Sequence, residues 1–600
     1  MAGESAEVVV IGSGAGGAPL THTLVRGGHR VVVLEKGPLL RTQAQSPTGL
    51  SDFKRDECFA TGSEKRITVQ GVANTGESYF SSHVEPDLND EPHVYRDSDG
   101  RDRVTIEGYT AQVVGGGTQL YGGVSPRFTP EDLRLATLNA SRGDLRDDPG
   151  GDVRREARDW PLDYAALEPY YTRAEELVGI NGTWDGQAKV PSQDHYQPPL
   201  EPNPISAYAA AGMDALGMRR YRTPLAVITR DHAPSGRTVP ADADSIKTAF
   251  VNRYGDPLGL KSNVWVSLLA PLRDIGGGLD LRANCTVTHL EADGPRVTTV
   301  HYRDPGGRPR TITAGTVVVA CSAIESVRLL RLSGLLDPAF DKRVDANGLL
   351  GRYFLTHCFG GAQCIVPERA DKSRTLDSDW ATDHCARPEW FRAQGLWAGG
   401  VIYNNTSDGA LPISLARTWH AMDMDNMWKG YLYDTGLVGN GFEDYLESSF
   451  GRRLSVAFMA NQVPQRENRI ELHPSVKDKW GRPVAYIVKT WHPHDRALMD
   501  ALAEQCRQIL VRGGDVRDVS SGSVGGSVVR IANHVLGGAR FGADAADSVL
   551  DPDCRAWNFD NLYVTDGAFM PTSGSANPTL TIEANSFRVG DVLLDRLGRP

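Results

Sequence analysis

Several features are missing from this sequence of 600 residues. It has no apolar run near the ~20 residues that cross a bilayer. It has no basic block and a net charge of −11, which argues against a nucleic-acid partner. Its eight cysteines lack C-x-x-C or metal-ligand spacing, so we predict no metal site and expect reduced thiols. The first expected strand begins at Val8, leaving no room for a signal peptide. A soluble, cytoplasmic protein is expected.

Glycine is abundant, and its first cluster lies in a pattern typical of dinucleotide binding. Val8–Ile11 is a β-branched run, as in a strand buried on both faces of a parallel sheet. A G-x-G-x-x-G stretch follows over 12–17 and leads into an expected helix, Ala18–Arg26. Val31–Leu34 is expected to be the second strand, and Glu35 stands at its end. Strand, glycine turn, helix, second strand and acid in this register predict a dinucleotide site.

Each glycine of this stretch has an expected task. Gly12 allows the tight turn, Gly14 allows the pyrophosphate to approach, and Gly17 lets the helix pack on the strand. Ala15 lies among them in the turn just before the helix, whose N-terminus favours phosphate. Glu35 is expected to accept a hydrogen bond from a ribose hydroxyl, and an acid there argues against a 2′-phosphate.

A second glycine-rich stretch covers Gly115–Gly123 and contains five glycines. Such a backbone can lie flat against a large planar ligand, although a flexible loop is the alternative. We include Gly116, Gly117 and Thr118 in the predicted cofactor site. Val287 joins them because it lies in a β-rich run expected to form a strand that returns to the cofactor.

Near the end of the chain, His534 and Asn577 are each embedded in small residues. A histidine is well suited to take a proton near neutral pH, and an asparagine can hold a hydroxyl without competing for that proton. The two would form an alcohol-oxidation site if a hydride acceptor lay nearby. The alternative is a buried structural histidine and an asparagine that turns the chain before Pro578. The dinucleotide pattern at the other end of the chain favours the first interpretation.

Aromatic residues concentrate between 351 and 525, where they could stack on sugar rings or simply fill the core. The strands expected here, Leu454–Met459, Arg469–Leu472 and Val484–Thr490, suggest a sheet that floors a substrate pocket. The segment from about 40 to 108 is polar and turn-rich, as in an irregular arm or covering loop. Seven of the eleven tryptophans lie in the 351–525 region: Trp380, Trp390, Trp397, Trp419, Trp428, Trp480 and Trp491.

Together these segments resemble the glucose–methanol–choline (GMC) family of FAD oxidoreductases. Within the family, the chain looks most like the pyranose oxidase branch, which includes bacterial enzymes that oxidise glycosides and C-glycosides at the 3-hydroxyl. The similarity runs along nearly the whole chain: Val8–Glu35, Gly115–Pro126, Trp160–Tyr171, Thr316–Gly334, Asn468–Leu472 and the His534/Asn577 end.

The resemblance implies a role for each residue of the predicted site. His534 would be the base that deprotonates a sugar hydroxyl, with Asn577 as its partner. Asp566 would lie near the ribityl-pyrophosphate of FAD, and Ala576 and Thr579 along the isoalloxazine edge.

Position 120 departs from the family pattern. Fungal pyranose 2-oxidases carry a histidine in the glycine-rich loop that binds FAD covalently, and here the matching position is Leu120. Non-covalent FAD is therefore expected.

The expected fold class is α/β, with an α+β substrate part. A Rossmann-like FAD-binding domain over 1–48, 108–130, 246–350 and 526–600 would be interleaved with a sheet-floored substrate-binding domain over 131–245 and 351–525. Residues 49–107 would form the arm.

The expected activity is FAD-dependent oxidation of a pyranose or glycoside hydroxyl, favouring C3 of glucosides, with O₂ or a quinone-like compound as electron acceptor. Three alternatives remain: a pyranose 2-oxidase on free glucose, a sugar dehydrogenase subunit, and a flavin-bearing protein that only binds or senses. The sequence leaves the oligomeric state open.

Overall fold

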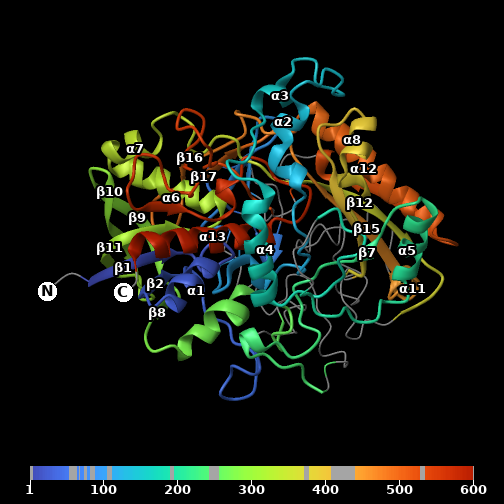
Figure 1. The fold of residues 1–600 in the computed structure, drawn as a ribbon, viewed down its shortest axis with the longest axis horizontal. Helices are drawn as coiled ribbons and strands as arrows, with labels where there is room; N and C mark the ends of the chain where they lie inside the picture. The colour runs from blue at the N-terminus through green and yellow to red at the C-terminus, as the bar shows by residue number, and fades with distance from the viewer. Residues whose placement is uncertain are drawn as a thin grey trace.

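The computed structural model describes residues 4–52, 64–66, 68–72, 78–80, 88–104, 108, 111–189, 195–241, 243, 256–370, 378–406, 439–526, 531 and 534–598. Trp419 and Trp428, and parts of the expected arm, lie outside these residues. Within them, the chain forms two large sheets and two smaller ones, and Figure 1 shows the two large sheets on opposite sides of the molecule.

The first large sheet has seven strands and contains the expected βαβ unit. Parallel pairing joins β8, β2, β1, β11 and β19, whereas β10 pairs antiparallel with both β11 and β9. The β-branched runs of the central strands, residues 8–11, 31–34 and 317–319, are buried, as expected in a parallel sheet. The strands are β1 (Glu4–Ile11), β2 (Val31–Leu34), β8 (Leu279–Arg282), β9 (Thr286–Asp293), β10 (Arg296–Arg303), β11 (Pro309–Val319) and β19 (Leu562–Val564).

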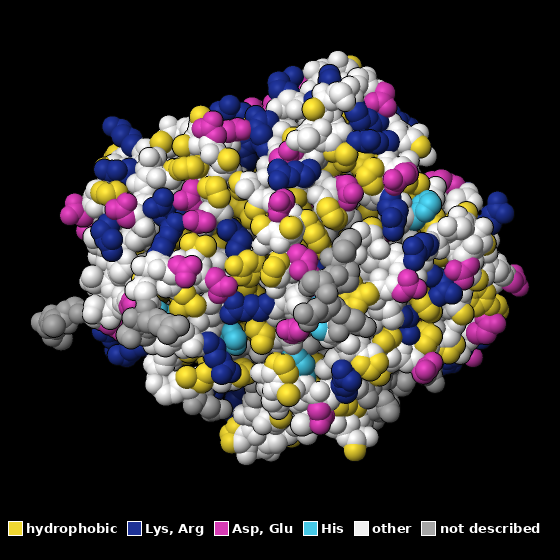
Figure 2. Space-filling view, viewed as in Figure 1, with side chains coloured by type: hydrophobic (Ala, Val, Ile, Leu, Met, Phe, Trp, Pro, Cys, Tyr) yellow, Lys and Arg dark blue, Asp and Glu magenta, His cyan; other side chains and the backbone are white. Residues whose placement is uncertain are grey.

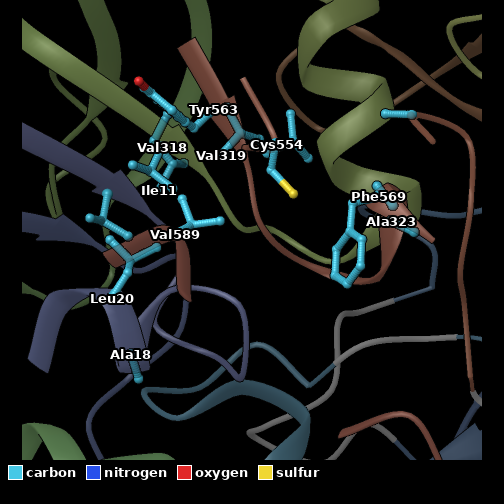
Figure 3. Packing of buried hydrophobic residues seen from close by; sticks show 14 of the residues in the cluster. Ile11, Ala18, Leu20, Val318, Val319, Ala323, Cys554, Tyr563, Phe569 and Val589 are labelled. Carbon is cyan, nitrogen blue, oxygen red and sulfur yellow. The ribbon is translucent and has the colours of Figure 1, made fainter. Parts of the chain in front are cut away.

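The first and last helices pack against each other beside this sheet. α1 (Ala18–Arg26) and α13 (Thr579–Leu597) approach so closely that a side chain at Gly590 would meet Leu20 and Thr23. Figure 3 shows Leu20 of α1 and Val589 of α13 in one core with Ile11 of β1. α6 (Ala323–Leu336) follows β11 and packs against β9, and α7 (Pro338–Val344) packs against α6.

The second large sheet has six strands, in the order β18-β12-β15-β14-β13-β7. α12 (Pro493–Arg512) and α5 (Ser206–Ala215) cover one face of this sheet, and the sheet and both helices share a second hydrophobic core. The strands are β7 (Tyr221–Arg222), β12 (Cys358–Ile365), β13 (Trp380–Thr382), β14 (Gly400–Asn405), β15 (Arg453–Ala460) and β18 (Arg517–Ser523).

The long helix α12 (Pro493–Arg512) shows how local sequence builds this layer. Pro493 stands at its first position, and Asp495 accepts a hydrogen bond from the His492 backbone N–H at 3.0 Å, so the N-terminus is capped. Leu498 and Leu502, one turn apart, are fully buried against the sheet.

Two of the three strands expected to floor a substrate pocket lie elsewhere. Only β15 belongs to the six-stranded sheet; β16 (Arg469–Lys477) and β17 (Pro483–Val488) form a four-stranded sheet with β5 (Val94–Arg96) and β6 (Asp102–Val104). The expectation of one sheet was therefore wrong, and so was an irregular structure for 94–104. Turn residues such as Asp97–Gly100 mark the β5–β6 hairpin, not a loop without strands.

The helix α4 spans Tyr164–Val178. Asp163 caps its N-terminus by accepting from Ala166 N–H at 2.9 Å, and Gly179 ends it with φ +83°. α4 packs on α13. The remaining short elements are α2 (Leu135–Asn139), α3 (Asp152–Glu156), α8 (Pro388–Ala393), α11 (Asn440–Ser449), β3 (Glu64–Arg66) and β4 (Ser78–Phe80).

Among the described helices, none is both long and apolar enough to span a bilayer. Figure 2 shows acidic and basic side chains interspersed over the face in view, without a large patch of one sign. This face gives no sign of the basic surface that a nucleic acid would need.

Candidate active site

A cavity lies at the carboxyl ends of the parallel strands β1, β2 and β11, where open α/β sheets bind their ligands. Its wall combines the beginning, the middle and the end of the chain. It includes residues 11–16, 34–36, 116–118, 285–287, 320–322, 534–536, 566–567 and 578–579.

The three glycines of the first turn are needed for different reasons. Gly12 has φ +100°, and a side chain there would collide with the carbonyl oxygen of Ala320. A side chain at Gly17 would collide with the carbonyl oxygen of Gly12, so this glycine serves packing and does not line the cavity. At Gly14, an added Cβ would find only the Cα of Gly116, at 3.7 Å. The space beside Gly14 is therefore open to a ligand.

Glu35 lines the cavity and also holds its wall together. Its carboxylate accepts from the Ser13 backbone N–H at 3.0 Å, from Ser13 Oγ at 2.7 Å and from Gly37 N–H at 2.9 Å. Ser13 Oγ in turn accepts from Gly115 N–H at 3.0 Å. Burial raises the pKa of Glu35, and these hydrogen bonds lower it in part. The carboxylate thus links the two glycine-rich segments, a role that its predicted contact with ribose did not include.

The second glycine-rich segment folds back onto the first. Gly115 and Gly116 have φ +96° and +56°, and a Cβ on Gly116 would lie 2.9 Å from the Cα of Gly14. Gly117 faces open space, with no atom within 4 Å of an added Cβ. Thr118 fixes the loop, since its Oγ1 donates to the Gly115 carbonyl at 2.6 Å and accepts from Val264 N–H at 3.1 Å.

Asp566 lines the cavity next to the first turn. It directly covers Gly16, where a Cβ would lie 2.7 Å from the Asp566 Cα. Its carboxylate accepts from Ala568 N–H at 2.9 Å and from the Ser326 hydroxyl. Burial raises the pKa of Asp566 to about 6, with the hydrogen bonds opposing the shift.

The N-terminus of α13 forms another part of the wall. Pro578, Thr579 and Ile582 line the cavity, so the partial positive charge of the helix start faces it. Ala576 is fully buried, and neither it nor Asn577 lies on the cavity wall.

His534 is on the cavity wall and contacts a second histidine, His357. Their Nδ1 atoms are 3.2 Å apart and the rings are nearly perpendicular, at 82°. Burial lowers the pKa of His534 to about 4, so its ring is neutral near pH 7. His357 is completely buried. His357 was not predicted from the sequence, since no motif surrounds Thr356-His357-Cys358.

Asn577 is joined to this pair through the segment before it. The backbone carbonyls of Ser573, Gly574 and Ala576 lie near the His357 ring and partly oppose the lowering of its pKa by burial. Asn577 is the next residue along the chain. Its Oδ1 is buried and has no hydrogen-bond partner among the described residues. The structure thus brings His534 to the cavity and places Asn577 in the segment that borders His357.

A charged group at the cavity wall was also missed. Glu325 accepts from His93 at 2.9 Å and from Arg328 at 3.1 Å, and Lys36 pairs with Glu91. Burial alone would raise the pKa of Glu325, but Arg328 and His93 hold it well below its ordinary value. No spacing in the sequence pointed to these residues, because the segment around 91–93 shows no clear period.

Of the residues predicted to bind cofactor, ten are on the cavity wall, and Gly17 and Ala576 are not. The ten are Gly12, Gly14, Ala15, Glu35, Gly116, Gly117, Thr118, Val287, Asp566 and Thr579.

Comparison with known proteins gives three matching family models. Two are described as GMC oxidoreductase and match residues 231–358 and 464–586; the third is an FAD binding domain and matches residues 7–58. The chain is a GMC oxidoreductase. It is therefore an FAD-dependent enzyme that acts on CH–OH groups.

Relatives along the whole length of the oxidoreductase agree with this family. A 2-methyl-1,2-propanediol dehydrogenase of Mycolicibacterium austroafricanum is 26% identical and covers 99% of this chain and 96% of its own. A 6'''-hydroxyparomomycin C oxidase of Streptomyces lividus is 29% identical, with 98% and 92% covered. The crystal structure of pyridoxine 4-oxidase from Mesorbium loti has the same fold, with a TM-score of 0.56 at 15% identity over 98% and 99% of the two chains.

The cavity of the oxidoreductase fits FAD. Its wall leaves free space beside Gly14 and Gly117, where backbone alone is presented. The first turn lies before α1 and offers backbone N–H groups to a pyrophosphate. The start of α13 offers a second positive helix end.

Proposed function

We propose that the oxidoreductase oxidises a secondary hydroxyl of a pyranose or glycoside, with C3 of glucosides, C-glycosides included, as the favoured position. The observation that carries this proposal is the location of His534, a buried neutral imidazole on the wall of the cavity that fits FAD. FAD, when bound, supplies the hydride acceptor, and the electrons end on O₂, giving H₂O₂, or on a quinone-like compound.

In this proposal His534 takes the hydroxyl proton. Its Nδ1 faces His357 at 3.2 Å, which leaves Nε2 as the atom that receives the proton. A positioned base of this kind contributes ~10²–10⁴-fold to the rate.

Asn577 lies just behind the cavity wall, next to Pro578 and Thr579, and in this proposal its side chain turns toward the cavity to hold the substrate. Its buried Oδ1 has no partner among the described residues, and an unpaired buried amide costs about 1–3 kcal/mol. A sugar hydroxyl that donates to Asn577 would relieve this cost, and the amide N–H group can donate to an oxygen next to the reacting carbon. Residues 131–245 and 351–525 would provide the substrate-binding domain.

Two relatives support a hydroxyl-bearing substrate, because their names give a diol and a hydroxylated compound as substrates. The preference for C3 rests on resemblance to the pyranose oxidase branch. Leu120, in place of a histidine that could bind the flavin, supports non-covalent FAD.

A dehydrogenase is the second candidate, because one relative covering 99% of this chain is named a dehydrogenase. It would carry out the same oxidation but pass electrons to an acceptor other than O₂.

The test is incubation of the FAD-loaded protein with a glucoside whose anomeric carbon is blocked, with O₂ or a quinone, followed by NMR of the product. A 3-keto product is expected. A 2-keto product would instead identify a pyranose 2-oxidase activity. Turnover with the quinone but not with O₂ would identify the dehydrogenase. No reaction with either acceptor, or with free glucose, would refute the proposal.

A further inference from the structure

His357 lies opposite His534 in a short antiparallel pairing. Leu355 N–H donates to the Leu536 carbonyl at 2.8 Å, and Leu536 N–H donates to the Leu355 carbonyl at 2.9 Å. His357 lies two residues after Leu355, and His534 lies two residues before Leu536. The two histidines are therefore opposite each other in the antiparallel pairing. Alternate residues of paired strands point to the same side. The backbone therefore places the two rings face to edge, with their Nδ1 atoms 3.2 Å apart.

The protons of the two rings must follow one of two patterns. Burial favours the neutral form of both rings, and His534 also disfavours a charge on His357. A neutral imidazole has one N–H and one acceptor nitrogen. Across the Nδ1–Nδ1 contact, one ring therefore donates and the other accepts.

The surroundings of His357 select between the two patterns. Its Nδ1 faces His534, so only Nε2 is left to face the backbone carbonyls of Ser573, Gly574 and Ala576, which act on this ring. Carbonyl oxygens accept hydrogen bonds and cannot donate them. His357 Nε2 has no hydrogen-bond partner among the described residues, but these carbonyl oxygens attract a proton there and repel a lone pair, so a proton on Nε2 is favoured. His357 Nδ1 is then the acceptor and His534 Nδ1 the donor.

We propose that His357 is a positioning residue that holds His534 as the Nδ1–H tautomer, which leaves the lone pair of His534 Nε2 facing the cavity. This inference rests on the proposed role of His534 as the base. In the opposite tautomer, Nε2 would carry the proton and His534 could not accept one from the alcohol. His357 also borders the segment that leads to Asn577, so it fixes the base and the residue that holds the substrate relative to each other.

The direct test is the protonation of His534 in the FAD-loaded protein without substrate. NMR of protein labelled with ¹⁵N in histidine separates protonated from unprotonated ring nitrogens, and His534→Gln assigns the signals. We expect His534 to be protonated at Nδ1 and unprotonated at Nε2 at pH 7. A proton found on Nε2 would overturn the inference. This measurement needs no turnover, so it stands even if no sugar proves to be a substrate.

The second test removes the acceptor. His357→Leu is expected to slow flavin reduction about 10–100-fold, as loss of a partner that orients a functional histidine typically does. His357→Asn keeps an oxygen that can accept from Nδ1–H and should restore most of the rate. His301→Asn, on β10 outside the cavity, is the matched control and should react as the wild type does.

The flavin absorbance spectrum checks that each variant binds FAD. Unchanged reduction by His357→Leu, or equal losses in the Leu and Asn variants with intact spectra, would contradict a positioning role. If the Leu variant does not hold FAD, the Asn variant and the NMR measurement decide.

Discussion

In the first turn, some glycines are needed for folding and another is needed for cofactor binding. Gly12 and Gly17 face backbone oxygens that leave no room for a side chain, whereas Gly14 faces the cavity. The same glycine motif therefore contains positions that the apoprotein needs and a position that only the cofactor needs.

We expect Gly14→Ala to weaken FAD binding while leaving the apoprotein nearly as stable as the wild type. The added methyl group has an ordinary contact, 3.7 Å, with the protein but occupies the approach of the pyrophosphate. FAD titration followed by flavin fluorescence, with thermal unfolding of the apoprotein, measures both effects.

Gly17→Ala is the matched control. Its methyl group would collide with the Gly12 carbonyl oxygen, so the apoprotein itself should lose stability, by roughly 1–3 kcal/mol for an overpacked site. Equal losses of apoprotein stability in both variants would mean that Gly14 also serves the fold.

The pKa of His534 gives a prediction for pH dependence. Burial lowers it to about 4, compared with 6.5 for a free histidine. The base is thus unprotonated at pH 6, and flavin reduction at saturating substrate should stay on its plateau there and fall only toward pH 4. His534→Ala should lower the plateau ~10²–10⁴-fold with the flavin spectrum intact. Stopped-flow reduction across pH measures both; a decline centred on pH 6.5 would contradict the buried, neutral base.

The same shift acts on stability with a definite sign. Between pH 6.5 and 4 the unfolded chain binds a proton at His534 that the native protein does not bind. The contribution of His534 to the free energy of unfolding therefore falls as the pH falls.

Sequence alone could predict site residues that belong to one local pattern. Gly12, Gly14 and Glu35 belong to one local βαβ pattern, and the structure places them together on the cavity wall. His357 could not be found this way, because its position depends on the pairing of Leu355 with Leu536, far apart in the sequence. Its neighbours carry no pattern that distinguishes it from an ordinary buried histidine.

At the scale of elements, α13 connects the cofactor cavity to the core. Thr579 and Ile582 line the cavity, and Glu583 in the next position is buried, with Oε1 unpartnered among the described residues. Burial raises the pKa of Glu583 to about 8. The helix therefore carries a neutral carboxylic acid at pH 7.

We expect Glu583→Gln to become increasingly stable relative to the wild type as the pH rises from 5 to 8. The native protein keeps the Glu583 proton over this range, whereas the unfolded chain releases it near pH 4.5. The free energy of unfolding of the wild type therefore falls by up to about 1.4 kcal/mol per pH unit. The amide side chain of the variant does not titrate, so the variant does not share this loss. Thermal unfolding of both proteins across this range measures the difference. Parallel Tm curves would show that Glu583 is ionised or solvated in the native state.

The prediction from sequence was wrong about which strands pair in one sheet. The strands at 469–477 and 483–488 were found, yet their sheet was wrong, since they pair with each other and with Val94–Arg96. Period and propensity identify a strand, but the pairing partner is chosen by tertiary packing. The parallel β1–β2 pair was predictable because a short helical crossover leaves few other arrangements.

At the scale of the whole molecule, the cavity joins segments that are otherwise far apart in the chain. Residues 12–16, 116–118, 566–567 and 578–579 form part of its wall, and α1 and α13 pack against each other beside it. A ligand that contacts all of them binds the native state and not the unfolded chain. Cofactor binding is therefore linked to the stability of both ends of the protein.

We expect FAD to raise the free energy of unfolding by about 2.7 kcal/mol when its free concentration is 100 times its Kd, with a matching rise in Tm. FMN lacks the adenosine half that the wall around Gly14 and Glu35 is expected to bind, so it should raise Tm less at the same concentration. Thermal unfolding of the apoprotein with each flavin measures the difference, and denaturation in acid should then release all of the FAD, because Leu120 offers no atom for a covalent bond. An equal rise in Tm with FMN would mean that the first turn does not contact the cofactor, and flavin that stays with the denatured chain would mean that another residue forms a covalent link.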